Sequence, residues 1–241
     1  MLKKCRVILA FAFALSFVTT TAPARAWTQS CQIKPSVVAA LLTDFASGIG
    51  VADISLLHPK WMWIAVVDRE GRLCATRSIG DAWPGSRAIA IAKASTANDF
   101  SNSQLSISTA MLYGATLPGA SLFGLNNSNP FNGFYNDPQI PAFGHVPGGI
   151  ITFGGGVALY VGTTVIGGLG VSGDTACADH DVAYTTRAIA IKSGVISPPV
   201  TGDNIAYETP VVPGHFTHPT CLGGEKPPGT SALPFATLRR R

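Results

Sequence analysis

Apolar residues recur at helical spacing in several stretches of the chain. Over Pro35–Gly50 they fall three or four positions apart, which predicts a helix that a proline opens and a glycine closes. Further helices are predicted from Pro84 to about Asn98, over Gln104–Tyr113 and over about Thr175–Ile191. Acidic residues crowd the start of the last helix and basic residues lie near its end, which suits the helix dipole.

Short runs rich in β-branched and aromatic residues lie between these helices. Trp61–Val67 and Arg72–Ile79 flank the turn sequence Asp68-Arg69-Glu70-Gly71 and predict a hairpin. Three more strands, separated by glycines, are predicted at Ile150–Phe153, Val157–Val161 and Thr164–Val171. The order of elements predicts an α+β fold, with helices packed against one five-stranded antiparallel sheet.

Two long segments lie outside these elements. Residues 114–147 are dense in glycine, proline and asparagine, and so long a loop in a compact domain is usually functional or interfacial. After Ser193 the chain becomes proline-rich and irregular. We therefore expect a signal segment (1–26), a folded domain (27–192) and a C-terminal extension (193–241) that a disulfide ties back.

The first 26 residues have the three parts of an export signal. Two lysines and an arginine precede the apolar run Val7–Val18, which is shorter than the roughly 20 residues that cross a bilayer. Ala24-Arg25-Ala26 then offers the small-x-small cleavage pattern. We predict a mature start at Trp27 and export to the periplasm or beyond, with a retained membrane anchor as the alternative.

Removal of this signal changes the charge of the protein. The whole chain has 17 basic and 13 acidic residues, and four of the basic ones lie in the first 26 positions. Three of the remaining basic residues form the C-terminal end, Arg239–Arg241. Without a clustered basic face we expect no nucleic-acid partner. No later apolar stretch is long and unbroken enough to cross a bilayer, so no membrane association is expected after cleavage.

Four cysteines remain after cleavage, and an even number in an exported protein predicts two disulfides, with three possible connectivities. We favour Cys31–Cys74 and Cys177–Cys221, because each bond would tie a peripheral segment to a core element. The alternative for the second pair is a zinc site, since Cys177-x-x-His180 and His215-x-x-His218-x-x-Cys221 supply zinc-binding side chains. The ligand spacing is loose, and an oxidising compartment favours the disulfide.

No catalytic constellation in the sequence is complete. Gly168–Gly173 matches G-x-G-x-x-G but lacks the acidic residue about 20 positions on that a dinucleotide site needs. Its amides at a helix start would still favour an anion. Ser172 lacks the G-x-S-x-G elbow of hydrolases. Asp179 and Asp181 are two positions apart and point in different directions, and C-x-x-C-H, which attaches haem covalently, is absent.

Several motifs occur together. Pro147-Gly148-Gly149-Ile150 precedes Val165–Gly173, which reads V-I-G-G-L-G-V-S-G. Ala65-Val66-Val67-Asp68 with Gly71 and the helical stretch Ile91–Ala97 support the same comparison. Over about residues 36–192 the chain resembles the GlcG/HbpS family of haem-binding or haem-degrading domains. The stretches that carry Cys177 and Cys221 look like those of a secreted branch of that family.

This resemblance implies a compact, often oligomeric domain that binds haem, another tetrapyrrole or a small ligand. The ligand-binding residues that it suggests are His145, Pro147, Gly148, Gly149, Gly170, Ser172, Gly173, Lys93 and Thr96. Among the histidines His145 is the most plausible haem-iron ligand, although a loop histidine exposed to water is the more common situation for such a residue. Both glycine segments would approach the ligand, and amides at the start of the last helix would meet the haem propionates. Lys93 and Thr96 would contact the ligand, or else cap or flank the core.

Three functions therefore stay open. The favoured one is an exported haem- or tetrapyrrole-binding protein. The second is an enzyme of haem-degrading type that acts on a tetrapyrrole or a small acid, for which the sequence offers no nucleophile–base pair. The third is a ligand-free oligomeric module in which the loop 114–147 forms the subunit interface.

Overall fold

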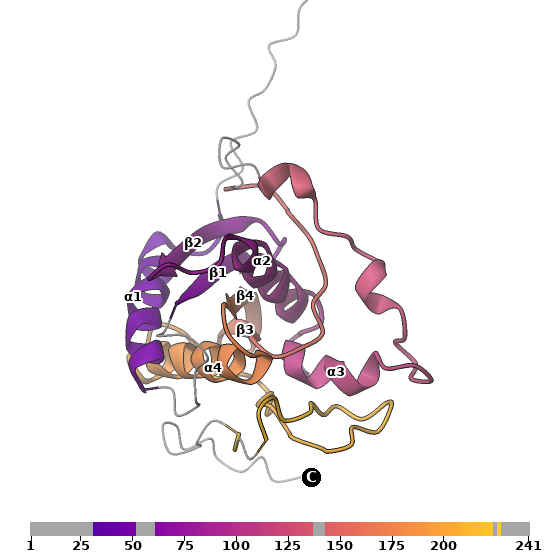
Figure 1. Cartoon of the computed structure of the whole chain (residues 1–241). Coiled ribbons are helices and arrows are strands. Elements are labelled where there is room, and N and C mark those ends of the chain that lie inside the picture. The colour runs from indigo at the N-terminus through magenta and orange to yellow at the C-terminus, as the bar shows by residue number, and fades with distance from the viewer. Residues whose placement is uncertain (1–30, 52–60, 137–142, 224–225, 228–241) are drawn as a thin grey trace, which may run out of the picture.

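The computed structural model describes residues 31–51, 61–136, 143–223 and 226–227 (Figure 1). The proposed signal segment, the mature start at Trp27 and the arginines at the C-terminus lie outside these residues.

Four helices and four strands form the described part of the chain. The helices are α1 (Pro35–Val51), α2 (Pro84–Asp99), α3 (Leu112–Ala115) and α4 (Ala176–Lys192). The strands are β1 (Met62–Asp68), β2 (Leu73–Ile79), β3 (Gly156–Val161) and β4 (Thr164–Ser172). Short 3-10 turns lie at Thr109–Met111, Leu125–Asn127 and Gly133–Asn136. The sheet has the order β2-β1-β4-β3, and each neighbouring pair is antiparallel, which confirms the predicted α+β class.

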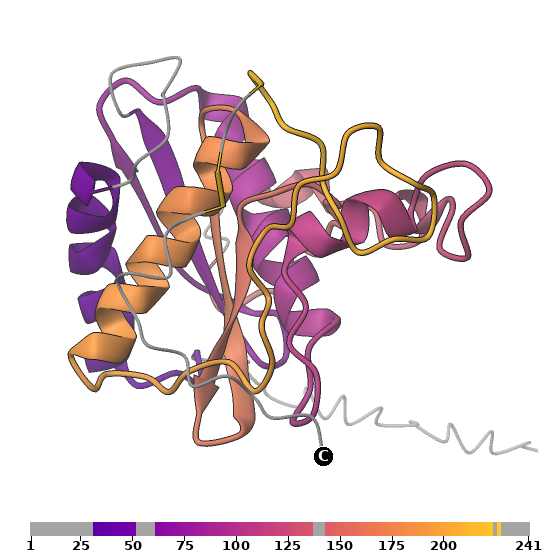
Figure 2. The ribbon, with the colours of Figure 1, turned by 90° about the horizontal axis from the view of Figure 1, so that it is seen from below.

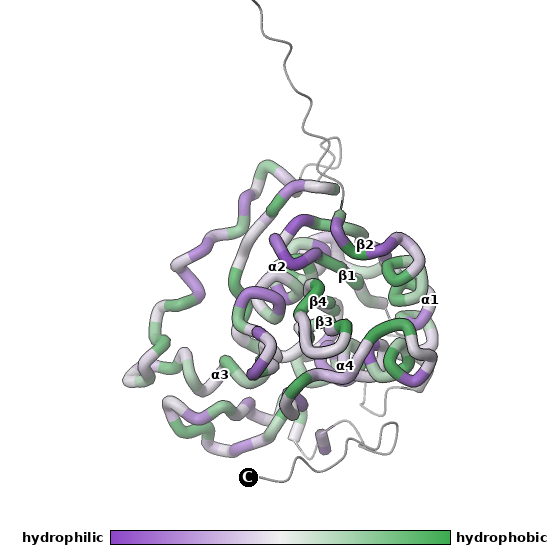
Figure 3. The backbone as a smooth tube through the Cα atoms, turned by 180° about the vertical axis from the view of Figure 1, so that it is seen from behind, coloured by the Kyte–Doolittle hydropathy of each residue, from purple (hydrophilic) through white to green (hydrophobic). Residues whose placement is uncertain are grey.

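Helices cover both faces of the sheet (Figures 1 and 2). Helices α1 and α4 lie together on one face, and α2 lies on the other. The alternation along β1 produces this division, because Ile64 packs with Phe45 of α1 in one core, whereas Ala65 packs with Ile91 of α2 in the other. Figure 3 shows hydrophobic stretches along β1 and in parts of β3, β4 and α1, where the sheet and the helices meet.

Helix α2 approaches the sheet very closely. A Cβ atom built on Gly168 would lie 2.0 Å from the Ala94 carbonyl oxygen, and one on Gly170 would lie 2.0 Å from that of Ala90. Any side chain at these two positions of β4 would therefore push α2 away from the strand. The glycines of the G-x-G-x-x-G pattern thus serve helix–sheet packing.

The sheet has four strands, so the prediction of a fifth at Ile150–Phe153 was wrong. This segment lies next to α2 instead of joining the ladder, and the Ile151 amide donates to the Thr96 hydroxyl at 3.0 Å. The side chain of an α2 residue thus takes the place of a strand partner.

The predicted helix over Gln104–Tyr113 was also wrong in its first half. The structure has a 3-10 turn at Thr109–Met111 and the single turn α3. Side chains satisfy the amides that a helix would have used, since Asn102 Oδ1 accepts from Gln104 and Leu105, and Ser101 Oγ accepts from Ile107.

The C-terminal extension runs along the side of the domain (Figure 2). It begins with a bridge between Ser197 and Tyr160 of β3 and ends at Cys221, in a disulfide with Cys177 of α4. A second disulfide joins Cys31, before α1, to Cys74 of β2. Both predicted disulfide pairings are confirmed. No helix in the described ranges is both long enough and apolar enough to cross a membrane.

Candidate functional site

His145 is held at the edge of the sheet by main-chain hydrogen bonds. The Leu73 amide at the start of β2 donates to the His145 carbonyl at 2.8 Å, and the Gly144 amide donates to the Leu73 carbonyl at 2.9 Å. The backbone of His145 is therefore fixed, whereas its side chain is exposed. Within the described ranges no hydrogen bond to its imidazole nitrogens is found.

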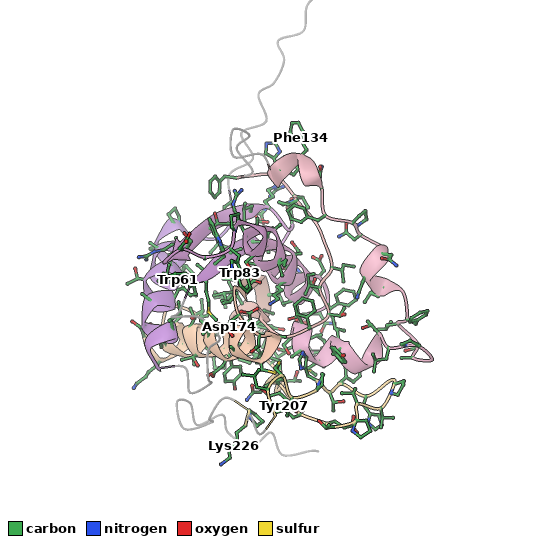
Figure 4. The ribbon with its side chains drawn as sticks, viewed as in Figure 1. Trp61, Trp83, Phe134, Asp174, Tyr207 and Lys226 are labelled. Atoms are coloured by element: carbon green, nitrogen blue, oxygen red, sulfur yellow. A yellow bond between two sulfur atoms is a disulfide. The ribbon has the colours of Figure 1, made fainter. Side chains whose placement is uncertain are left out.

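One aromatic ring stacks on this imidazole, and further exposed apolar residues lie near it in the chain. The ring of Tyr135 stacks on that of His145, with centroids 5.1 Å apart and planes 21° apart, and Phe134 meets Tyr135 edge to face. Phe134, Phe143 and Val146 are each more than half exposed, and Figure 4 shows Phe134 at the outer end of the long loop, directed away from the domain. We call Phe134, Tyr135, Phe143, His145 and Val146 the His145 surface.

Pro147, Gly148 and Gly149 lie beneath this surface and are buried. The Pro147 carbonyl accepts the Asn132 amide at 2.8 Å. A Cβ atom on Gly149, where φ is +90°, would lie 2.7 Å from that of Ala92 on α2. The predicted V-P-G-G segment and Thr96 thus lie together, and they support the loop that carries His145.

The other predicted site residues lie apart from the His145 surface. Gly170 is covered by α2, as described above. Ser172 is buried and pairs with Trp63 of β1, and a Cβ atom on Gly173 would lie 2.5 Å from the Trp61 carbonyl oxygen. All three are enclosed by their own chain. Pro147–Gly149 follow His145 directly in the chain, and the buried Thr96 hydroxyl contacts this loop through the Ile151 amide.

Acceptors of the protein itself occupy the amides at the start of α4. The Asp174 amide donates to Asp179 Oδ1 at 3.0 Å, and the Thr175 side chain caps the helix by accepting from Ala178. The Cys177 amide points to the Cys221 sulfur at 3.1 Å. These amides therefore offer no donor to the propionates that the sequence led us to expect there.

Lys93 forms a buried ion pair. Its Nζ lies 2.7 Å from Asp179 Oδ2 and donates to the Val171 carbonyl at 3.1 Å, and both side chains are almost wholly buried. Burial raises the pKa of Asp179 to about 6 against the opposing effect of the Lys93 charge. Burial also lowers the pKa of Lys93, although Asp179 opposes that change. The enclosed ammonium has no path to an external ligand in this conformation, so it flanks the core.

Several buried polar residues were not predicted from the sequence. His180, expected at a surface or packed on a helix, is fully buried and accepts the Ile205 amide at its Nε2; burial lowers its pKa to about 3. Arg187 makes two hydrogen bonds to the carboxylate of Asp203 in the extension. The sequence does indicate that Arg187 is buried, because helical spacing places it on the same face of α4 as Ala183 and Ala190, which are buried.

A family model described as "Haem degrading protein HbpS-like" matches residues 53–188. The chain belongs to the HbpS-like family. The match covers the sheet, α2 and most of α4, together with the loop that bears His145. It ends before the C-terminal extension, so Cys221 and Asp203 lie outside the HbpS-like segment while their partners, Cys177 and Arg187, lie within it.

The HbpS-like segment has curated relatives. Over 125 residues the chain is 34% identical to the corrinoid adenosyltransferase PduO of Citrobacter freundii and 33% identical to that of Salmonella typhimurium. Each match covers 52% of this chain and 31% of the relative. The chain thus spans about a third of the length of these relatives.

Solved structures also resemble the HbpS-like chain. A PduOC:heme complex is 27% identical with a TM-score of 0.49, over 65% of this chain and 93% of that one. The Klebsiella pneumoniae protein ORFY is 23% identical with a TM-score of 0.48, over 69% and 95%. A structure of HbpS is 19% identical with a TM-score of 0.43, over 70% and 96%.

Proposed function

We propose that the protein binds haem and that the His145 imidazole is a ligand of the iron. The observation that carries the proposal is an exposed imidazole, fixed through its backbone and stacked on Tyr135, among exposed apolar side chains. A porphyrin needs an apolar, aromatic surface for its ring and a neutral imidazole for its metal. The description of the family points to the same ligand.

The other described histidines suit iron less well. His180 and His218 are buried, and main-chain amides donate to the Nε2 atom of each. His215 is exposed but pairs through Nδ1 with Glu208. The imidazoles of His180, His215 and His218 are thus each engaged within the protein. The His145 imidazole instead lies exposed beside an aromatic ring.

Haemin titration followed in the Soret region tests this proposal. We expect the native protein to shift and sharpen the Soret band, and we expect His145→Ala to lose the spectrum of an imidazole-ligated iron. His215→Ala, which removes the other exposed histidine, is the matched control and should behave as the native protein does. A native protein that leaves the haemin spectrum unchanged excludes haem binding. An unaltered titration with His145→Ala excludes this residue as the ligand.

We also propose that the protein is exported. Two disulfides among the four cysteines that remain after residue 26 support an oxidising compartment, as does the tripartite pattern of the first 26 residues. The mass of the protein recovered from the periplasm or medium tests the cleavage after Ala26. Self-association stays a prediction, which light scattering with and without haemin would measure.

A further inference from the structure

A group of metal-ligating side chains lies where the extension meets α4. The sulfurs of Cys177 and Cys221 and an imidazole nitrogen of His218 all lie within 4.8 Å of one another. Cys177 and His218 are almost wholly buried, and Cys221 is half-buried. In the oxidised protein the two sulfurs are bonded to each other, so only the imidazole of this group can bind a metal ion.

We propose that Cys177, Cys221 and His218 form a zinc-binding site when the Cys177–Cys221 disulfide is reduced. The extension is then joined to α4 by the disulfide in the oxidised protein and by the bound zinc ion in the reduced protein. Two thiolates and one imidazole are a ligand set that zinc prefers, and the fourth position of the tetrahedron is left to water.

The hydrogen bonds of His218 already prepare the ring for a metal. Its Nδ1 lies 2.6 Å from the Pro219 carbonyl oxygen, and the Gly154 amide donates to its Nε2 at 3.3 Å, a long hydrogen bond that zinc at Nε2 would replace. These partners define a neutral ring with the proton on Nδ1. A ring proton donated to a main-chain carbonyl is the usual second contact of a metal-bound histidine, because it fixes the tautomer and the ring orientation.

The environment of the disulfide favours attack of a reductant on one of its two sulfurs. Cys221 is the more exposed partner, so a thiolate of a dithiol reductant attacks its sulfur. Cys177 then leaves as a thiolate at the second residue of α4, where the helix dipole stabilises negative charge. The second thiol of the reductant closes its own disulfide and frees Cys221. Two electrons pass to the cysteine pair, and zinc binding releases the protons of the thiols that are still protonated.

Zinc binding requires only a small movement of the two sulfurs. Two sulfurs on one zinc lie roughly 3.7 Å apart, given a Zn–S distance of about 2.3 Å in a tetrahedron. The sulfurs must therefore separate by roughly 1.7 Å from an ordinary disulfide bond length of about 2.05 Å. Cys221 lies in an irregular segment, outside helix and strand, where this shift breaks no ladder.

A second group in the structure has similar spacing but a different environment. Cys31, Cys74 and Asp68 also lie within 4.8 Å of one another. Both carboxylate oxygens of Asp68 already accept main-chain amides, and the Arg72 guanidinium lies 3.6 Å away. A cation there would meet a positive charge and a committed carboxylate, so we assign the zinc site to the His218 group alone.

Cobalt(II) serves as the probe, because thiolate-to-cobalt charge transfer and tetrahedral d–d bands report on sulfur ligation. The test uses full-length protein in a Cys5→Ser/Cys31→Ser/Cys74→Ser background, reduced with a phosphine that becomes phosphine oxide and adds no competing thiol. We expect one equivalent of cobalt to bind with both sets of bands and zinc to displace it. The oxidised form of the same protein should show neither band.

Two histidine variants complete the test, and circular dichroism with a thiol count shows that each is folded and reduced. His218→Gln should lose the tetrahedral bands, and His215→Gln, three residues away and exposed, should keep them. Absence of thiolate bands in the reduced, folded protein overturns the proposal, and so does an unchanged spectrum with His218→Gln. Neither result bears on haem binding at His145, which is measured on the oxidised protein.

Discussion

The ammonium of Lys93 lies 2.7 Å from the carboxylate of Asp179, although the two residues belong to helices on opposite faces of the sheet. The ion pair passes the end of the sheet, where Lys93 also donates to the Val171 carbonyl of β4. It thus links α2, the sheet and α4 through a single side chain. Burying this ion pair costs the free energy of dehydrating both charges, so the pair as a whole adds little to the free energy of unfolding. Removing one partner leaves the other charge buried and unpaired, and therefore lowers that free energy strongly.

Lys93→Met is expected to destabilise the protein by about 3–5 kcal/mol near pH 7, because it leaves Asp179 buried without a cation. Burial raises the pKa of Asp179 to about 6, from an ordinary value of 3.8. The folded state therefore binds this proton more tightly than the unfolded state does, and the corresponding stability is lost as the pH rises from about 4 through 6. Without Lys93 that pKa rises further, and the loss continues to higher pH.

Urea unfolding at about pH 5 and about pH 7 measures this difference. The deficit of Lys93→Met relative to the native protein should be larger at the higher pH. Lys192→Met, at the exposed end of α4, is the control and should change stability little at either pH. An equal deficit at both pH values would contradict the assignment to Asp179.

Asp203→Ala is expected to loosen the extension and to cost about 3–5 kcal/mol, since the buried Arg187 guanidinium loses both hydrogen bonds to the carboxylate. Amide hydrogen exchange should rise over the extension more than over α2. Glu208→Ala removes solvent-accessible contacts with His215, Thr217 and Val212 inside the extension and leaves no buried charge unpaired, so it should have a smaller effect on unfolding. Equal effects of the two variants would show that the Arg187 pair does not hold the extension.

Gly170→Ala is expected to destabilise the fold by about 1–3 kcal/mol, because the new methyl group would lie 2.0 Å from the Ala90 carbonyl oxygen of α2. Gly85→Ala, near the start of α2, has no atom within 4 Å of its new methyl group and should be neutral or slightly stabilising. Denaturant unfolding compares the two. A tolerated Gly170→Ala would mean that α2 can move away from the sheet at little cost.

Tyr135→Ala is expected to weaken haemin binding by about 0.5–1.5 kcal/mol, which is the contribution of one favourable ring contact. The variant removes the ring that stacks on His145 and leaves the backbone contact with Leu73 in place. Phe123→Ala removes a more exposed aromatic ring elsewhere on the long loop and should leave the affinity unchanged. Identical losses with both variants would indicate nonspecific association of haemin with exposed aromatic rings.

Local patterns were enough to predict the hairpin, α2 and α4. Asp68 and Gly71 close the turn through a 2.9 Å hydrogen bond, as the turn sequence indicates, and Gly71 has the positive φ that the turn requires. The even cysteine count and the expected compartment predicted two disulfides, and the pairing was chosen so that each bond ties a peripheral segment to a core element. These features depend on residues that are close in sequence or few in number.

Contacts between distant segments account for the errors. Ile150–Phe153 has the composition of a strand, but the Thr96 hydroxyl on α2 takes its amide. Residues 104–108 could form a helix, but Ser106 donates its amide to Thr201 of the extension. A single sequence does not show that these partners meet.

The residues predicted for the candidate site also fall into two groups: those that remain candidates for ligand binding and those that serve packing within the protein. His145 and the V-P-G-G segment came from motif resemblance; they are consecutive in the chain, and their role in ligand binding stays a prediction. Gly170 and Gly173 belong to the same motif, yet their lack of a side chain serves α2 and β1 within the protein. A conserved-looking glycine pattern does not by itself tell a ligand contact from a close backbone contact.

The Cys177–Cys221 bond encloses α4 and the extension in one covalent ring of the chain. A protease that cuts once between these cysteines opens that ring without releasing either piece. The nicked protein would therefore migrate as one molecule under oxidising conditions and as two after reduction, so a single band on a non-reducing gel is no proof of an intact chain.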